Sequence, residues 1–161
     1  MSVQGGEALS KALKDLGAGL DGAVNKAIVR TANQVRGEAI KMISREQSMG
    51  RTYTHYFTAM LPNGALIEGE KRSKPHTASA AGDAPNTDTG RLVGSIAVEN
   101  PRRGTSFVGT SVEYGKYLEF GTSKMAARPW LRPAMERNQA KLTENITNAI
   151  KESISNVRGG Q

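Results

Sequence analysis

Apolar residues recur at steps of three and four near the start of the chain. The stripe comprises Leu9, Leu13, Leu16, Leu20, Val24, Ile28, Val35 and Met42. Such spacing places these side chains on one face of a helix. Gly17, Gly19 and Gly22 interrupt the stripe, and each costs about 1 kcal/mol relative to Ala inside a helix. We therefore expect a flexible or frayed N-terminus over residues 1–20 and a long helix over residues 21–45.

A second stripe of this kind lies near the end of the chain. It comprises Met135, Leu142, Ile146, Ile150, Ile154 and Val157, with Asn, Lys, Glu and Ser between them. The pattern predicts an amphipathic C-terminal helix over residues 133–157. Pro133 suits the first turn of this helix, where a missing backbone N–H has no cost.

Residues 46–90 differ in character and are expected to form an extended arm or loop. TYTHYFTAML and ALIEGEKR are strand-like, and Pro62-Asn63-Gly64 between them has the residue types of a tight turn. SKPHTASAAGDAPNTDTG follows and shows neither the helical nor the strand period. A loop of this length in a small domain is usually functional, or is disordered until it binds.

Residues 91–132 are expected to hold a small sheet and a short helix. SIAVEN and TSFVGTSV alternate as strands on either side of a turn at residues 101–104. Asp88 or Thr89 can cap a short helix that follows them. EYGKYLEF predicts another short helix, which ends at Gly121 in the left-handed conformation that only Gly adopts cheaply.

These elements predict an α+β fold. We expect two long amphipathic helices packed on a small antiparallel sheet, with a long central loop or β-arm. The 161 residues suit one domain, because two domains of half this size would each bury too little surface. We therefore expect residues 1–161 to form a single domain.

Cysteine is absent, which excludes disulfides and cysteine-ligated metal sites. The first twenty residues lack the continuous apolar core of a secretory signal, and the chain has no apolar run long enough to cross a bilayer. We therefore expect a soluble protein that is made in the cytoplasm and has no membrane partner.

The formal net charge of +7 raises the question of nucleic acid binding. The positive charge is spread thinly, with 7 Lys/Arg against 5 Asp/Glu in residues 1–48 and 5 against 3 in residues 131–161. No basic run exceeds a pair such as Arg102-Arg103. This distribution argues against sequence-specific readout, and it leaves weak, non-specific contact with DNA as an alternative.

Catalytic and metal-binding patterns are missing from the sequence. His55 and His76 have no second ligand at helical spacing, and no Gly-x-Ser-x-Gly elbow is present. GTSFVGTS lacks the Lys of a phosphate-binding loop. Asp83 and Asp88 lie in turn-forming sequence, where Asp has a structural role. We expect no enzyme activity, no metal and no cofactor.

The stretch YLEFGTSKMAARPWLRP, residues 117–133, concentrates aromatic and arginine residues. One interpretation is that Trp130 and Leu131 fill the core. The other is that Tyr, Trp and Arg anchor a protein interface, as these residue types often do. The candidate interface residues are Tyr114, Tyr117, Phe120, Arg128, Trp130, Arg132, His76, Asp88 and Arg91.

The order of several motifs resembles one protein family. HTASA with a following Gly and Pro, DTGRL, SI, YLEFGT, MAARP and PA occur in this order across residues 20–155. The pattern is similar to the tail-component or neck family of long-tailed bacteriophages, which includes the minor tail protein Z type of lambda-like phages. Two departures are AGDAP, where the family usually has Pro-Gly-Glu-x-Pro, and a longer arm over residues 53–70.

This resemblance implies a structural protein of the virion neck that joins the DNA-filled head to the tail during tail completion. Its expected partners are copies of itself in a ring, guessed to be a hexamer, the head connector or stopper protein, and the tail terminator or tail tube protein. The alternative is a terminator or connector that caps the tail tube. We further expect residues 46–90 to become ordered in the ring, and Arg128→Ala to weaken head–tail joining without unfolding the monomer.

Overall fold

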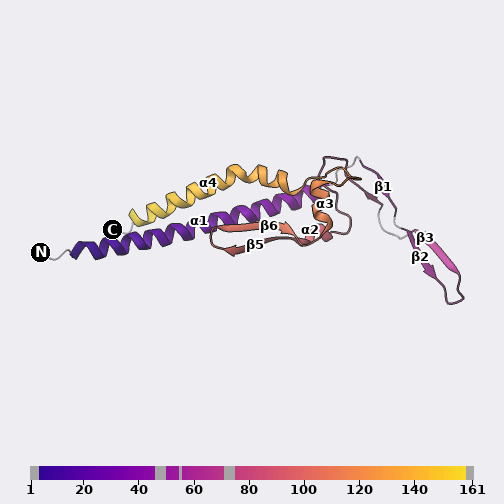
Figure 1. The fold of residues 1–161 in the computed structure, drawn as a ribbon, viewed down its shortest axis with the longest axis horizontal. Coiled ribbons are helices and arrows are strands. Elements are labelled where there is room, and N and C mark those ends of the chain that lie inside the picture. The colour runs from indigo at the N-terminus through magenta and orange to yellow at the C-terminus, as the bar shows by residue number, and fades with distance from the viewer. Residues whose placement is uncertain (1–3, 46–49, 55, 71–74, 159–161) are drawn as a thin grey trace. The chain divides into compact units, whose positions relative to one another are not determined.

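The computed structural model describes residues 4–45, 50–54, 56–70 and 75–158, and it has the expected α+β class (Figure 1). The helices are α1 (Gln4–Ser44), α2 (Arg91–Ser95), α3 (Tyr114–Phe120) and α4 (Leu131–Arg158). The strands are β1 (Thr52–Tyr53), β2 (Tyr56–Met60), β3 (Leu66–Glu70), β4 (His76–Thr77), β5 (Ile96–Arg102) and β6 (Thr105–Thr110). They form three separate two-stranded sheets, β1–β4, β2–β3 and β5–β6. The sequence predicted β2–β3 as an arm and β5–β6 as a small sheet, and it did not predict β1–β4.

The chain divides into two compact units. Unit 1 consists of Met1–Glu38, Ile96–Gly109 and Pro133–Gln161, and unit 2 of Ala39–Ser95 and Thr110–Arg132. Unit 1 therefore holds most of both long helices and the β5–β6 hairpin. Unit 2 holds the short helices and the other two sheets. The expectation that residues 1–161 fold as one domain stays a prediction.

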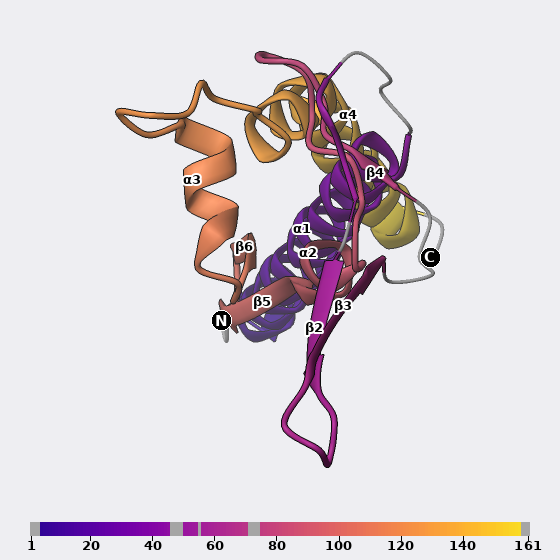
Figure 2. The same ribbon diagram turned by 90° about the vertical axis from the view of Figure 1, so that its right-hand side faces the viewer.

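In unit 1, α1 lies between α4 and the β5–β6 hairpin (Figures 1 and 2). The Asn145 side-chain amide donates to Thr31 Oγ1 at 2.9 Å and to Gln34 Oε1 at 3.2 Å. Farther along α1, Glu38 forms an ion pair with Arg137 at 3.0 Å. Residue numbers rise along α1 as they fall along α4, so the two helices are antiparallel.

Two polar contacts hold the β5–β6 hairpin on the other side of α1. Arg36 Nε donates to the Ile96 carbonyl oxygen at 2.7 Å, at the start of β5. At the hairpin turn, the Gly104 amide donates to Asn25 Oδ1 at 2.9 Å. Gly104 has φ +74°, a conformation that glycine adopts without steric cost. The predicted turn is confirmed at Arg103 and Gly104, whereas Pro101 and Arg102 belong to β5. These two contacts fix the position of the hairpin along α1 at both of its ends.

The helix α1 begins at Gln4 and continues through Gly17, Gly19 and Gly22, so the expected break before residue 21 is wrong. Helix propensity is a weak effect that packing routinely overrides, and adding a residue to an existing helix is favourable where starting one is not. Leu13, from the predicted stripe, is 59% exposed. Val35 and Met42, also from the stripe, are buried as predicted. The other buried residues of α1 are mostly small: Ala27, Thr31, Ala32, Ala39 and Ile43.

In unit 2, β2 and β3 form the predicted hairpin. Tyr56 pairs with Glu70 at one end, and Met60 pairs with Leu66 beside the turn. The Gly64 amide donates to the Leu61 carbonyl at 2.9 Å, and Gly64 has φ +81°. Parts of the predicted arm, residues 46–49, 55 and 71–74, lie outside the described residues.

Candidate interface site

The candidate residues gather around α3 and the segment that follows it. Gly121 ends α3, and its amide donates to the Tyr117 carbonyl at 2.8 Å. Its φ of +75° confirms the need for glycine, but its ψ of −175° lies outside the left-handed helical region that the sequence predicted. This extended, positive-φ region is essentially restricted to glycine. A Cβ here would also lie 2.8 Å from the Ala127 nitrogen and from the Met125 oxygen.

Glu119, which was not among the candidates, holds the start of α4. Its Oε2 accepts hydrogen bonds from the Trp130 amide at 2.8 Å and the Leu131 amide at 2.9 Å, and its Oε1 accepts one from the Arg132 amide at 2.9 Å. The first amides of a helix have no partner within the helix, and a carboxylate stabilises them through hydrogen bonds and charge. The acceptor comes from another element, 11 to 13 positions earlier, so no local capping motif in the sequence indicated it.

Trp130 belongs to the core of unit 2. Its side chain is 1% exposed, and its indole Nε1 donates to the Gly115 carbonyl at 3.3 Å. Of the two interpretations of Trp130, the core interpretation is confirmed. A partner cannot reach this side chain in the folded unit, so we remove Trp130 from the candidate interface residues.

Five candidates line one cavity of about 390 Å³ within unit 2, which we call the unit 2 cavity. They are His76, Asp88, Arg91, Tyr114 and Arg128. Apolar side chains complete the wall, among them Ile43, Pro85, Leu92, Val93 and Leu118. The cavity thus combines an apolar lining with a few charged groups, the usual composition of a site that binds another molecule. Tyr114 and Leu118, four positions apart on α3, both border the cavity.

The irregular segment after β4, residues 78–90, forms another wall of the cavity and is hydrogen-bonded to other parts of unit 2. The Asn86 side-chain amide donates to the Thr77 carbonyl at 2.7 Å, and Thr87 Oγ1 donates to the Ile43 carbonyl at 3.0 Å. The Gly82 amide donates to the Ala127 carbonyl at 2.9 Å. The prediction of a loop is confirmed for residues 78–90, which have a defined path, whereas His76–Thr77 form the strand β4.

Arg128 helps to hold that segment. Its Nε donates to the Ser79 carbonyl at 3.1 Å, and its backbone amide donates to the Leu118 carbonyl at 2.6 Å. Ser79 also lines the cavity, and its hydroxyl is buried without a hydrogen-bond partner among the described residues. Removing the Arg128 side chain therefore alters folding as well as any interface, which changes how Arg128→Ala must be interpreted.

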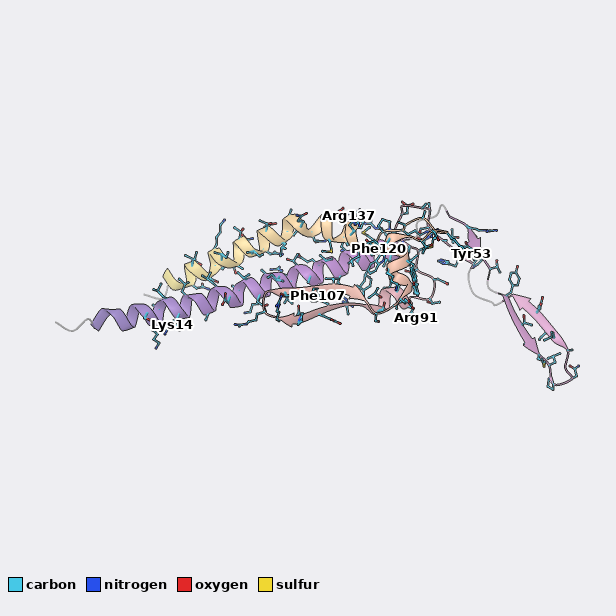
Figure 3. The ribbon with its side chains drawn as sticks, in the orientation of Figure 1. Lys14, Tyr53, Arg91, Phe107, Phe120 and Arg137 are labelled. Atoms are coloured by element: carbon cyan, nitrogen blue, oxygen red, sulfur yellow. The ribbon has the colours of Figure 1, made fainter. Side chains whose placement is uncertain are left out.

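The other three candidates, Tyr117, Phe120 and Arg132, are exposed. Phe120 is 70% exposed at the end of α3 (Figure 3). Tyr117 lies in a surface cluster, where its hydroxyl and Lys116 Nζ both donate to Glu113 Oε1, at 3.3 Å and 3.4 Å. The hydrogen bond to Glu113 raises the pKa of Lys116 above its usual value, and the Tyr117 charge adds to this.

A second group of exposed apolar residues lies on the β2–β3 hairpin and was not among the candidates. Tyr56 is 76% exposed, Met60 73% and Leu66 66%. A two-stranded hairpin has no core of its own and is marginally stable at best in water. The signal was present in the sequence as two apolar strand-like arms, but whether such side chains are buried or exposed depends on the fold and not on the strand pattern.

Among the described residues, no group of three or more His, Cys, Asp or Glu side chains is placed to hold a metal ion. Within the same ranges, no helix has the length and apolar character needed to span a membrane. Comparisons of the chain with protein-family models, with curated proteins and with solved structures find no match.

Proposed function

We propose that this protein is a structural subunit of a bacteriophage neck, which assembles as a ring and joins the DNA-filled head to the tail. The observation that carries the proposal is the set of large apolar side chains exposed on the β2–β3 hairpin and on α3. Apolar groups exposed together mark interaction surfaces. The motif resemblance over residues 20–155 supplies the particular setting.

A ring follows from how such surfaces combine. If one surface of a subunit binds a different surface of its neighbour, the contacts repeat head to tail and close when the rotation allows. The chain offers two unlike surfaces of this kind, an exposed hairpin and a cavity with charged walls. The same properties suit a tail terminator or a connector that caps the tube, and this remains the second candidate.

We expected residues 46–90 to become ordered in the ring, and we now restrict this expectation to part of that range. Residues 78–90 carry hydrogen bonds to Ile43, Thr77 and Ala127, so we assign ordering upon assembly to the hairpin, residues 56–70, rather than to the whole of residues 46–90. Greater amide protection of residues 56–70 in the ring than in the monomer is the expected hydrogen-exchange result.

The proposal is tested by complementing a phage that lacks this protein. Phe120→Ser and Arg132→Glu change exposed side chains, and the Arg132 contact to Glu119 uses only the backbone amide. We expect both variants to fold and to reduce joined particles at least about tenfold, leaving separate heads and tails in electron micrographs. Lys141→Ser, at an exposed position of α4, is the matched control.

Wild-type numbers of joined particles with both variants would argue against a contact role for this surface. Absence of the chain from purified virions and from the heads and tails that precede them would contradict the proposed function itself.

A further inference from the structure

Directly paired residues of two antiparallel strands point to the same side of the sheet, so the pairing shows which residues of the β2–β3 hairpin share a face. Thr58 and Met60 share a face with their partners Glu68 and Leu66. Met60 and Leu66 are both largely exposed, and Glu68 follows Leu66 by two positions on that face. The end of the hairpin therefore presents an apolar pair with a carboxylate about 7 Å farther along the strand.

The hairpin is also acidic in a basic protein. Residues 56–70 contain Glu68 and Glu70 and no Lys, Arg or His, whereas the whole chain has a net charge of +7. The unit 2 cavity has the opposite character. Its walls carry Arg91 and Arg128 against Asp88. Complementary charge of this kind favours correct partners and disfavours wrong ones.

The cavity also suits an apolar pair. Leu92, Val93 and Leu118 line it, and its volume of about 390 Å³ lies within the range of sites that take a few side chains or a small ligand. Arg91 is exposed at the start of α2, and no hydrogen bond or ion pair of its guanidinium is recorded among the described residues (Figure 3). The buried Ser79 hydroxyl in the cavity wall has no hydrogen-bond partner among the described residues.

We propose that the Met60–Leu66 end of the hairpin of one copy binds in the unit 2 cavity of a second copy, with Glu68 paired to Arg91. This inference rests on the proposed ring and names its subunit contact. The hairpin and the cavity are different surfaces, so the contact is head-to-tail and repeats from copy to copy.

The absence of cysteine allows a direct test. Leu66→Cys and Val93→Cys are made in separate proteins, which are then mixed and treated with a short bis-maleimide. Leu66 is exposed on the hairpin, and Val93 lines the cavity. We expect a mixed dimer whose linked peptides contain positions 66 and 93. Because each chain has one cysteine, this product arises only between copies.

Charge exchange makes the test specific. Glu68→Arg in the Leu66→Cys chain is expected to lower the yield of the mixed dimer at least about fivefold, and Arg91→Glu in the Val93→Cys chain to restore it. The control pairs Leu66→Cys with Ser155→Cys on the exposed face of α4. Circular dichroism of each protein checks that the variants are folded.

A mixed dimer no more abundant than in the control, or a yield that does not respond to the charge exchange, overturns the inference. Cross-linking of position 66 to a head or tail protein in virions, and not to position 93, also overturns it while leaving the proposed neck function intact. Failure of the neck function is recognised separately, because the chain is then missing from virions and their precursors whatever the cross-linking result.

Discussion

At the scale of single residues, Glu119 connects α3 to the first turn of α4. Both of its carboxylate oxygens are used, on the amides of Trp130, Leu131 and Arg132. A helix start with buried neighbours needs acceptors for these amides, since water is kept away from them. Trp130 is such a neighbour, being almost completely buried.

We expect Glu119→Ala to lower the free energy of unfolding by about 1–2 kcal/mol, because three helix-start amides lose a charged acceptor. Glu119→Gln keeps one oxygen acceptor and should cost less. Urea unfolding followed by circular dichroism measures both. Glu144→Ala, at an exposed position of the same helix, is the control, and an equal effect at positions 119 and 144 would contradict this role.

At the scale of elements, periodicity in the sequence located the long helices and the strands of the β5–β6 hairpin. Turn-forming residues located the β2–β3 turn and the end of α3. Periodicity misplaced the start of α1, because the intrinsic cost of Gly17, Gly19 and Gly22 is small beside the advantage of extending a helix that already exists. The periodic pattern was also built from large apolar residues alone and left out the small residues that are buried. Leu13 is exposed, whereas Ala27 and Ala39 are buried, since the helix contacts favour small side chains.

The glycines inside α1 provide a test of this account. A Cβ at Gly17 would have no heavy atom within 4 Å beyond the helix itself. Gly17→Ala should therefore raise the free energy of unfolding by about 0.5–1 kcal/mol, by removing the conformational entropy of glycine from the unfolded chain. Thermal unfolding measures the change. No increase would indicate that the helix is not formed at residue 17 in solution.

The candidate site was predictable in part. His76, Asp88, Arg91, Tyr114 and Arg128 were selected by residue type, and the fold brings them to one cavity. Their convergence depends on the long segment and α3 folding together, which no spacing in the sequence encodes. Trp130 was ambiguous because the same side chain suits a core and an interface equally well. Only burial separates these roles.

At the scale of the whole molecule, the surplus of positive charge is dispersed over both units rather than gathered in one stripe. Dispersed charge supports weak phosphate contacts and no reading of bases. Such contacts are compatible with a subunit that surrounds DNA in a channel, and they do not define a DNA-binding protein.

We expect gel shifts with duplex DNA to show weak retention near 50 mM salt that is lost by about 200 mM, with no preference among sequences. Arg102→Ser with Arg103→Ser, at the exposed β5–β6 turn, should reduce retention at low salt without affecting stability. Tight binding that persists at 200 mM salt, or that distinguishes sequences, would favour a nucleic-acid function instead.

Hydrogen bonds hold the segment from Gly121 to Trp130 at both ends and in its middle. Gly121 turns the chain, Thr122 and Met125 bond to each other, and the Arg128 and Trp130 amides return to Leu118 and Glu119. These hydrogen bonds constrain the number of residues in the segment, even at positions where the type of side chain is not constrained. Substitutions at the exposed Ser123 and Lys124 are therefore expected to be tolerated. A single inserted or deleted residue would move Trp130 out of its buried position in the core.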